Sequence, residues 1–268
     1  MSQAPLAVFA IDGICREAGH QPVAIVTSRR TRGDGSSLAE MLAGAAPDVD
    51  VLYAARKTSL APLFRAYEPD LVICIGFPWL FPQEALDVPR LGAINIHPSK
   101  LPLYRGPFPL PWAIRNGETE IAMTVHRMDA NFDTGAILAQ APMPIDEAVW
   151  AFEQMIPHYA AAVQEIVPRA LARIAAGEEG EPQEGDPGVY AAAFEDEFRQ
   201  IDWSRSAREI HNQVRAWAVL GFGGEREAPV GEVDGEPRRI LRTSLEPAEG
   251  TRVEAGDGPI WVTESEPA

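Results

Sequence analysis

The feature that most constrains the fold is a short apolar run at residues 69–76, PDLVICIG, which has no charged residue after Asp70. Strands buried on both faces of a sheet have this composition, whereas strands with one solvated face alternate between apolar and polar residues. Similar runs at residues 22–28, 49–54 and 92–97 are separated by helical or loop segments. This alternation predicts an α/β protein with a doubly wound, mostly parallel sheet.

The rest of the chain continues the same pattern. Two further strands are expected at residues 121–128 and 135–144, and a small β-rich region after the last helix. Pro157 and Pro168 should bend or divide the third expected helix, and Ser204 should cap the fourth. The expected helices cover residues 6–18, 36–45, 146–176 and 202–217.

The composition of the chain changes near residue 177. Residues 177–188 are rich in Gly, Pro and Glu, which is typical of a linker. We therefore expect a catalytic domain at residues 1–176 and a small α+β or β-rich C-terminal domain at residues 189–268. A doubly wound sheet usually begins with a strand, yet this sequence enters a helical pattern almost at once. The first strand of the catalytic domain is therefore expected to be missing.

The charge balance restricts the partners of the chain. It carries 39 Asp and Glu against 23 Lys and Arg, a formal net charge of −16, which argues against broad nucleic-acid binding. Cys15 and Cys74 lie in apolar contexts, so we expect reduced thiols and no metal site. No apolar run reaches 18 residues and no signal-peptide pattern is present. We expect a cytoplasmic protein that does not bind a membrane.

Polar residues with catalytic chemistry occur at Asn95-Ile-His97-Pro-Ser99 and at Asp133-Thr-Gly135. Asn95 and His97 are alternate residues of a strand end, so their side chains project from the same face. An amide and an imidazole on one face can stabilise the oxyanion that forms when an amine attacks an acyl carbon. Asp133 would orient His97, raise its pKa or accept the proton of the attacking nitrogen.

A hydrolytic triad of Ser99, His97 and Asp133 is an alternative, but the sequence lacks the G-x-S-x-G elbow of such enzymes. Ser99 is better explained as a turn residue. The remaining histidines do not have the spacing of metal ligands and are expected at the surface or in packing. They are His20, His126, His158 and His211.

Two aromatic residues lie where the apolar run ends. Trp79 and Phe81 stand beside Pro78 and Pro82, and in α/β sheets ligands bind beyond the carboxyl ends of the strands. Their rings could hold a flat heterocycle at such a crevice, or they could belong to the core.

Three ordered segments, Asn95 to Ser99, Leu101 to Gly106 and Met128 to Gly135, resemble the motifs of the folate-dependent formyltransferase family. This family includes methionyl-tRNA formyltransferases, nucleotide-sugar N-formyltransferases and hydroxyornithine formyltransferases. The resemblance covers residues 4–176 well and residues 190–217 weakly. It implies a Rossmann-like catalytic domain, with 10-formyltetrahydrofolate as the co-substrate.

The resemblance also implies roles for individual residues. Asn95, His97 and Asp133 would be catalytic, and Tyr104 and Arg105 would contact the acceptor substrate. The residues expected to bind the folate are Trp79, Leu80, Phe81, Ser99, Leu101, Pro102, Asp129 and Asn131.

The acceptor is suggested by charge alone. Residues 181–268 contain 19 Asp and Glu against 9 Arg and no Lys, which would repel the phosphates of tRNA. We therefore expect a small-molecule amine or hydroxylamine as the acceptor, and allow for a homodimer. A nucleotide sugar and methionyl-tRNA remain alternative acceptors. Two further alternatives are a 10-formyltetrahydrofolate hydrolase and a non-catalytic folate-binding relative.

Overall fold

The computed structural model describes residues 4–28, 48–220 and 228–268. Its contacts divide the chain into two compact units whose segments alternate along the sequence. This division differs from the sequential boundary expected at residues 177–188, because two earlier segments pack with the C-terminal residues. Unit 1 comprises Met1–Gly106, Ala122–Met143 and Pro157–Tyr190, and unit 2 comprises Pro107–Ile121, Pro144–Ile156 and Ala191–Ala268.

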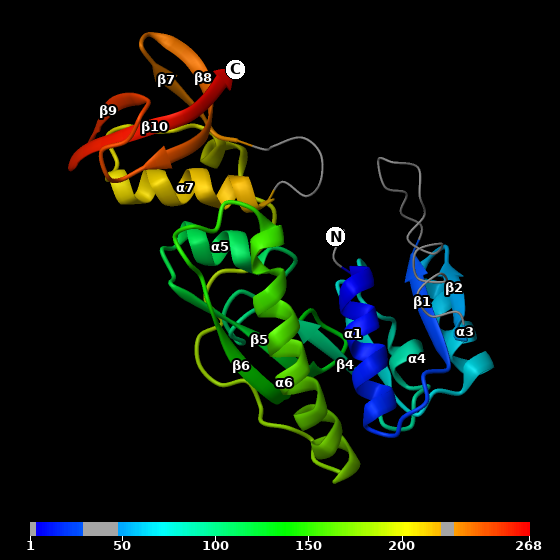
Figure 1. Cartoon of the computed structure of the whole chain (residues 1–268). Coiled ribbons are helices and arrows are strands. Elements are labelled where there is room, and N and C mark those ends of the chain that lie inside the picture. The colour runs from blue at the N-terminus through cyan, green and yellow to red at the C-terminus, as the bar shows by residue number, and fades with distance from the viewer. Residues whose placement is uncertain (1–3, 29–47, 221–227) are drawn as a thin grey trace. The chain divides into compact units, whose positions relative to one another are not determined.

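The larger of the two sheets in unit 1 has four strands in the order β3-β4-β5-β6, of which Figure 1 labels β4, β5 and β6. β3 and β4 are parallel, and Cys74 lies opposite Asn95. β4 and β5 are antiparallel, and Asn95 lies opposite His126. The carboxyl ends of β3 and β4 therefore meet at one edge, as the sequence predicted. The strands cover Val72–Ile75 (β3), Ala93–His97 (β4), Glu120–Arg127 (β5) and Ile137–Pro144 (β6).

Among the described residues, a second sheet is formed by the parallel strands β1 (Ala24–Ser28) and β2 (Asp50–Ala54). The predicted α/β class with parallel strand pairs is thereby confirmed. Among the strands that the structure describes, β1 and β3 are not hydrogen-bonded neighbours. The first described element is a helix, α1 (Ala4–Glu17), as expected, and a missing first strand stays a prediction. The helix predicted at residues 36–45 lies outside the described residues.

An apolar cluster in unit 1 fixes the segment that follows β3. Helices α3 (Leu60–Tyr67) and α4 (Gln83–Leu86) contribute to it, together with Cys74 and Phe81. The ring of Phe81 is 5% exposed. Its burial removes a large apolar surface from water, which stabilises this part of the fold.

The helix predicted over residues 146–176 begins later than expected. A short 3₁₀ helix, η2 (Phe152–Met155), precedes α6 (Ile156–Ala175). Pro157 lies in the first turn of α6, where a missing backbone N–H costs little, and Pro168 lies inside the helix. The buried face of α6 is apolar and includes Val163, Ile166, Val167, Ala170, Leu171 and Ile174.

Unit 2 combines helices α5 (Pro109–Arg115) and α7 (Ala207–Leu220) with a four-stranded sheet in the order β7-β8-β10-β9. The predicted β-rich tail is therefore present. All strand pairs of this sheet are antiparallel. The strands cover Val230–Val233 (β7), Glu236–Ser244 (β8), Thr251–Ala255 (β9) and Gly258–Pro267 (β10).

The start of α7 corrects one sequence expectation. The helix begins at Ala207, so Ser206 and not Ser204 precedes it. The backbone N–H of Glu209 donates to Ser206 Oγ (3.3 Å), and the backbone N–H of Ser206 donates to Glu209 Oε2 (3.1 Å). These two bonds form a capping box. Ser204 instead donates from its backbone and its hydroxyl to Asp202 Oδ1, which makes it part of a turn.

In the described part of the chain, no helix has both the length and the apolar composition needed to cross a membrane.

Candidate active site

Asn95 and His97 stand at the carboxyl end of β4 and both approach Asp133. Asn95 Nδ2 donates to Asp133 Oδ1 (3.3 Å), and His97 Nδ1 lies 3.8 Å from the same oxygen. All three residues belong to unit 1. The structure thus brings together the three side chains that the sequence singled out as catalytic, and it does so as one polar cluster.

A fourth member of this cluster, His126, was missed by sequence reasoning. Its side chain is 2% exposed, and its Nε2 lies 3.2 Å from Asn95 Nδ2 and 3.5 Å from Asp133 Oδ1. The antiparallel pairing of β4 and β5 places it opposite Asn95. The signal in the sequence was weak: Thr124 and His126 are alternate polar residues in the buried part of β5, residues 121–126, which is otherwise apolar.

The hydrogen-bond partners indicate where the imidazole protons lie. His126 Nδ1 is 2.7 Å from the carbonyl of Arg127, and a carbonyl only accepts, so Nδ1 carries the hydrogen. In the neutral ring Nε2 then accepts from the Asn95 amide. By the same argument His97 Nε2–H donates to the carbonyl of Tyr104 (3.2 Å). The unprotonated Nδ1 of neutral His97 faces Asp133.

Asp133 is an anion held within this cluster. Burial would raise the pKa of its carboxyl, but the electrostatic interactions with the His126 and His97 rings oppose that effect. The backbone N–H of Gly106 also donates to Asp133 Oδ2 (2.9 Å). Together these partners lower the pKa of Asp133 to about 2.

The pKa of His97 shifts in the direction opposite to the sequence expectation. Asp133 does raise it, as predicted, but burial lowers it more, and His126 lowers it further. The side chain is only 8% exposed. The net result is a neutral imidazole beside a carboxylate, an arrangement that can take up one proton.

The loop that carries Asp133 is fixed by Asp129. Thr134 Oγ1 donates to both carboxylate oxygens of Asp129 (2.6 and 2.8 Å), and the backbone N–H of Asn131 donates to Oδ1 (2.9 Å). Asp133 itself has a left-handed backbone with φ of 56°, a conformation that Asp tolerates better than most residues. Asp129 and Asn131 were expected to bind folate; here Asp129 shapes the loop.

Gln183 ties this loop to the Leu101–Gly106 segment. Its Nε2 donates to the carbonyls of Asp133 and Gly135, both at 2.8 Å. Its Oε1 accepts two bonds from Arg105, at 2.7 Å from Nη2 and 3.1 Å from Nε. Sequence reasoning placed Gln183 in a linker and Arg105 in the acceptor site. A role of Arg105 in binding the acceptor stays a prediction. In the structure its guanidinium binds Gln183 and so helps to hold the loop.

The other predicted site residues lie around this cluster in different degrees of burial. Ser99, Leu101 and Tyr104 are buried, Pro102, Trp79 and Leu80 are half-buried, and Asn131 is exposed. Within the described residues Ser99 Oγ has no hydrogen-bond partner, so the alternative Ser99–His97–Asp133 triad is not formed.

The segment from Phe77 to Phe81 is rigid because its rings pack together. Phe77 meets both Trp79 and Phe81 edge-on, with ring centroids 5.5 Å apart in each pair. Phe81 also contacts Phe64 at 5.9 Å. Phe81 is thus a core residue, while Trp79 and Leu80 keep part of their surface open to solvent.

Comparisons with known proteins place the chain in a family. The sequence profile of the family described as Formyl transferase matches residues 12–171. A methionyl-tRNA formyltransferase from Geobacter sulfurreducens is 34% identical over 267 residues, which cover 92% of this chain and 82% of that protein. The chain belongs to the formyl transferase family. The resemblance inferred from Asn95 to Gly135 is thereby confirmed, and this formyltransferase is an enzyme of the transferase class.

Other relatives agree. A methionyl-tRNA formyltransferase from Synechococcus sp. (strain JA-2-3B'a(2-13)) is 32% identical over 223 residues, covering 77% of this formyltransferase and 68% of that protein. Among solved structures, an N-formyltransferase from Helicobacter canadensis, in complex with folinic acid and dTDP-3-aminofucose, has a TM-score of 0.70 and 18% identity. The match covers 97% of this chain and 96% of that one. At this identity the likeness shows the fold, which is the predicted Rossmann-like formyltransferase fold.

Proposed function

We propose that this formyltransferase takes a formyl group from 10-formyltetrahydrofolate and transfers it to the amine or hydroxylamine nitrogen of a small molecule. The observation that carries the proposal is the cluster of Asn95, His97 and Asp133 around one carboxylate oxygen. A folate co-substrate is supported by two solved relatives, described with folinic acid and with tetrahydrofolic acid.

The proposed reaction begins when the neutral acceptor nitrogen attacks the formyl carbon. A carbon–nitrogen bond forms and the formyl oxygen becomes an oxyanion, which an amide hydrogen of Asn95 stabilises. That hydrogen must turn away from Asp133, and the bond of 3.3 Å is long enough to exchange readily. Asp133 is then free to accept a proton.

The second half of the reaction moves one proton. The attacking nitrogen gives its proton to Asp133 or to Nδ1 of neutral His97, which lie 3.8 Å apart and can share it. The bond between the formyl carbon and N10 of tetrahydrofolate breaks, and N10 takes up the proton. His126 would act by holding the Asn95 amide in place.

Two segments are proposed to hold the folate. The segment with Trp79, Leu80 and Phe81 offers backbone groups on a stretch that ring packing keeps rigid. The loop from Asp129 to Asp133 is fixed by the carboxylate of Asp129. Both carry residues that the sequence assigned to the folate site, which Ser99, Leu101 and Pro102 would border.

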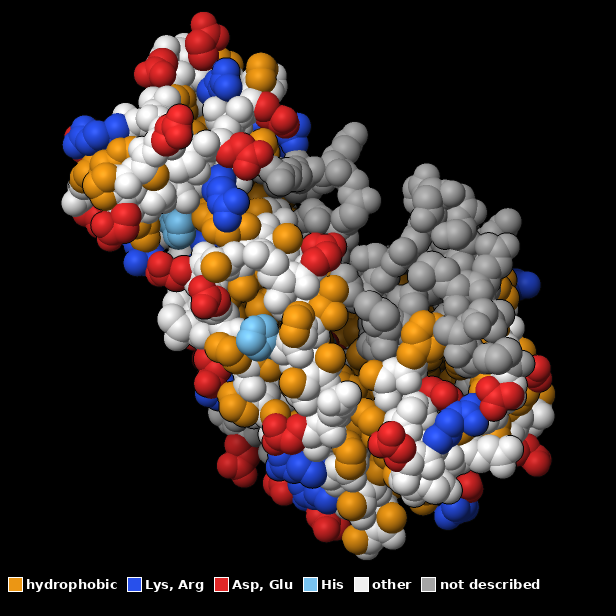
Figure 2. Space-filling view, in the orientation of Figure 1, with side chains coloured by type: hydrophobic (Ala, Val, Ile, Leu, Met, Phe, Trp, Pro, Cys, Tyr) orange, Lys and Arg blue, Asp and Glu red, His pale blue; other side chains and the backbone are white. Residues whose placement is uncertain are grey.

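A small acceptor is supported by charge. The 19 acidic residues at positions 181–268 exceed the 9 arginines by ten. On the face that Figure 2 shows, acidic and basic side chains are interspersed over this part of the molecule. The repulsion of a polyanion therefore rests on the net excess of acidic residues in this segment.

Methionyl-tRNA is the second candidate acceptor, and a specific observation favours it. The relatives at 34% and 32% identity are both methionyl-tRNA formyltransferases.

The deciding experiment measures the release of tetrahydrofolate from 10-formyltetrahydrofolate with separate acceptors: amines, hydroxylamines, amino sugars, nucleotide amino sugars and charged initiator tRNA. Release that depends on a small amine or hydroxylamine supports the proposal. If release occurs only with the tRNA, or only with a nucleotide sugar, that molecule is the acceptor and the small amine is not. Release without any acceptor indicates a hydrolase, and folate binding without release indicates a non-catalytic relative.

A matched pair of variants provides the control. Asp133→Asn should abolish the release. Asp234→Asn makes the same change at an exposed residue of unit 2 that also has a left-handed backbone, with φ of 53°, and should leave the release unchanged.

A further inference from the structure

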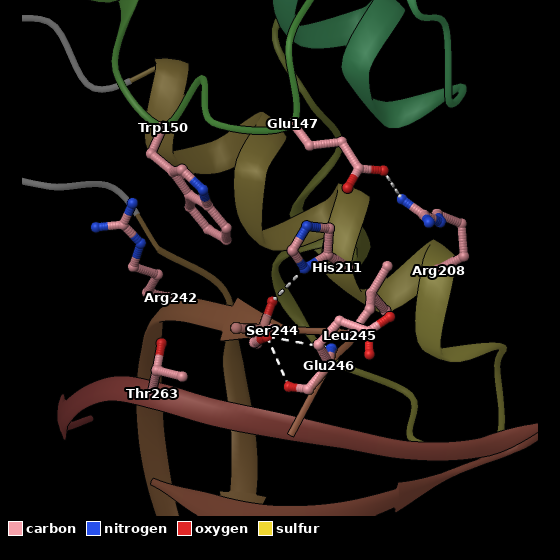
Figure 3. A pocket seen from close by; sticks show the side chains of 10 residues that line it. Glu147, Trp150, Arg208, His211, Arg242, Ser244, Leu245, Glu246 and Thr263 are labelled. Atoms are coloured by element: carbon pink, nitrogen blue, oxygen red, sulfur yellow. Dashed lines mark hydrogen bonds and ion pairs between the residues drawn. The ribbon is translucent and has the colours of Figure 1, made fainter. Parts of the chain in front are cut away.

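We propose that unit 2 carries a separate binding site for a small aromatic monocarboxylate. The site is a cavity of about 370 Å³ whose lining comes from the segment before α6, from α7 and from strands β8 and β10. Figure 3 shows Trp150, His211, Arg242, Ser244 and Thr263 arranged around its opening. All of these residues belong to unit 2, whereas Asn95, His97 and Asp133 belong to unit 1.

One wall of the cavity is aromatic. The rings of Trp150 and His211 meet edge-on, with centroids 5.2 Å apart and an interplanar angle of 88°. The His211 ring is fixed because its Nδ1 lies 2.9 Å from the hydroxyl of Thr243, and the residue is 5% exposed. A rigid indole beside a rigid imidazole offers a surface on which a flat ring can stack.

A cation lies next to this aromatic wall. The guanidinium carbon of Arg242 is 5.1 Å from the centroid of the Trp150 ring, and the hydroxyl-bearing side chain of Thr263 is on the same side of the opening (Figure 3). A guanidinium and a hydroxyl can both donate to a carboxylate. A ring on Trp150 that carries an acidic group would place that group near Arg242.

The charged residues around the cavity leave one guanidinium available for a carboxylate. Arg208 and Glu147 form an ion pair and neutralise each other. The other two charged lining residues are Glu246 and Arg242, and within the described residues Arg242 is in contact with the ring of Trp150 and not with a carboxylate. Arg215 does not line the cavity: it is 4% exposed and donates to the carbonyls of Asp146 (2.7 Å) and Val149 (3.4 Å).

The lining contains two arginines and two glutamates and so carries no net charge, in a segment where acidic residues outnumber arginines 19 to 9. His211 adds no charge. Burial, Arg215 and Arg208 lower the pKa of His211 to about 4, so the ring is neutral near pH 7. A single carboxylate matches this balance better than a doubly charged phosphate does.

The volume limits the size of the ligand. Pockets for small molecules range from roughly 300 to 1,000 Å³, so a cavity of about 370 Å³ is at the small end. It suits one or two fused rings with a short acidic side chain.

The test titrates the full chain, in the absence of folate and acceptor, with indole-3-acetate as the probe and follows the heat of binding. Indole and acetate, tested separately, should each bind at least tenfold more weakly than the complete probe. Arg242→Gln should weaken indole-3-acetate binding at least tenfold. Arg239→Gln changes an arginine of the same strand that pairs with Glu266, and should alter binding less than twofold.

Two further measurements separate the alternatives. Trp150→Phe retains a flat ring and should weaken binding less than Arg242→Gln does, which also checks that loss of binding does not come from unfolding. The proposal is overturned if indole-3-acetate does not bind saturably, or if Arg242→Gln binds it as wild type does. Tighter binding of adenosine monophosphate than of indole-3-acetate would also overturn it, because the ligand would then be a phosphate. None of these outcomes depends on formyl transfer.

Discussion

At the scale of single residues, the proton balance between His97 and Asp133 is the property on which the proposed mechanism depends. Burial keeps His97 neutral, while the polar groups around Asp133 keep its carboxylate ionised. A catalyst in this state accepts a proton from the attacking nitrogen and does not supply one to the oxyanion. The Asn95 amide is then the main donor to the oxyanion.

Removing either partner should therefore slow the chemistry and spare binding. His97→Ala and Asp133→Asn should each lower kcat at least about 100-fold, because each removes a proton acceptor. The affinity for folate, measured by fluorescence titration, should change less than about threefold. Turnover close to wild type in either variant would exclude that residue from the mechanism.

His126 should affect the reaction through Asn95. In His126→Phe, the Asn95 amide loses the acceptor that lies 3.2 Å away, so its orientation toward the oxyanion is lost. We expect kcat to fall about tenfold or more while KM for the folate stays within about twofold. His158→Phe, on α6, should leave both constants unchanged. A rise in KM without a fall in kcat would contradict a positioning role.

At the scale of elements, the loop before β6 depends on close backbone contact at Gly135. A Cβ atom at this position would lie 2.0 Å from the carbonyl oxygen of Arg127. That atom belongs to the backbone of β5 and cannot move aside, so the loop would have to shift.

Two glycine substitutions give a direct comparison. Gly135→Ala should destabilise the fold by about 3 kcal/mol or more, and should also lower turnover because the loop carries Asp133. Gly13→Ala in α1 meets no atom within 4 Å and should instead stabilise the fold by about 0.5–1 kcal/mol, since alanine favours a helix. Urea unfolding of both variants measures the two changes. Equal stability of Gly135→Ala and wild type would show that the close approach of residue 135 to the Arg127 carbonyl does not constrain the loop.

The sequence predicted the elements that depend on local pattern. The apolar runs became β3 and β4, and the alternate positions of Asn95 and His97 placed both side chains toward Asp133. It failed where a contact joins distant residues. His126 enters the site only through the pairing of β4 with β5, and Gln183 reaches the loop from 48 residues away. Ser204 was expected to cap the helix although the sequence carries the capping-box spacing at Ser206 and Glu209 and an Asx-turn pattern at Asp202 and Ser204.

At the scale of the whole molecule, acid should lower the stability of this chain over two separate pH ranges. The folded-state pKa of His211 is about 4, below its ordinary value of about 6.5. The unfolded chain therefore binds a proton that the folded chain does not, and stability present above pH 6.5 is lost as the pH falls toward 4. For Asp133 the corresponding loss falls between pH 3.8 and about 2.

The first of these two losses can be measured separately. At pH 5 the contribution of His211 to the free energy of unfolding should be about 2 kcal/mol smaller than at pH 7.5. In His211→Asn, which keeps a hydrogen-bonding group near Thr243 but does not titrate, this loss should be absent. All but one of the six tryptophans lie in unit 2, so tryptophan fluorescence during urea unfolding reports mainly on the unit that contains His211. An equal pH dependence in both proteins would contradict the assignment.

The contact between Gln183 and the Asp133 loop determines where the chain can be recombined with a relative. Gln183 holds the carbonyls on both sides of Thr134 and also binds Arg105. A chimera that joins its two parents at Gly177, where the composition changes, would pair the loop with a foreign residue in place of Gln183. A chimera joined after Tyr190 keeps the pair intact. The position where the composition changes and the position where two related chains can be joined without separating Gln183 from its loop are thus about a dozen residues apart.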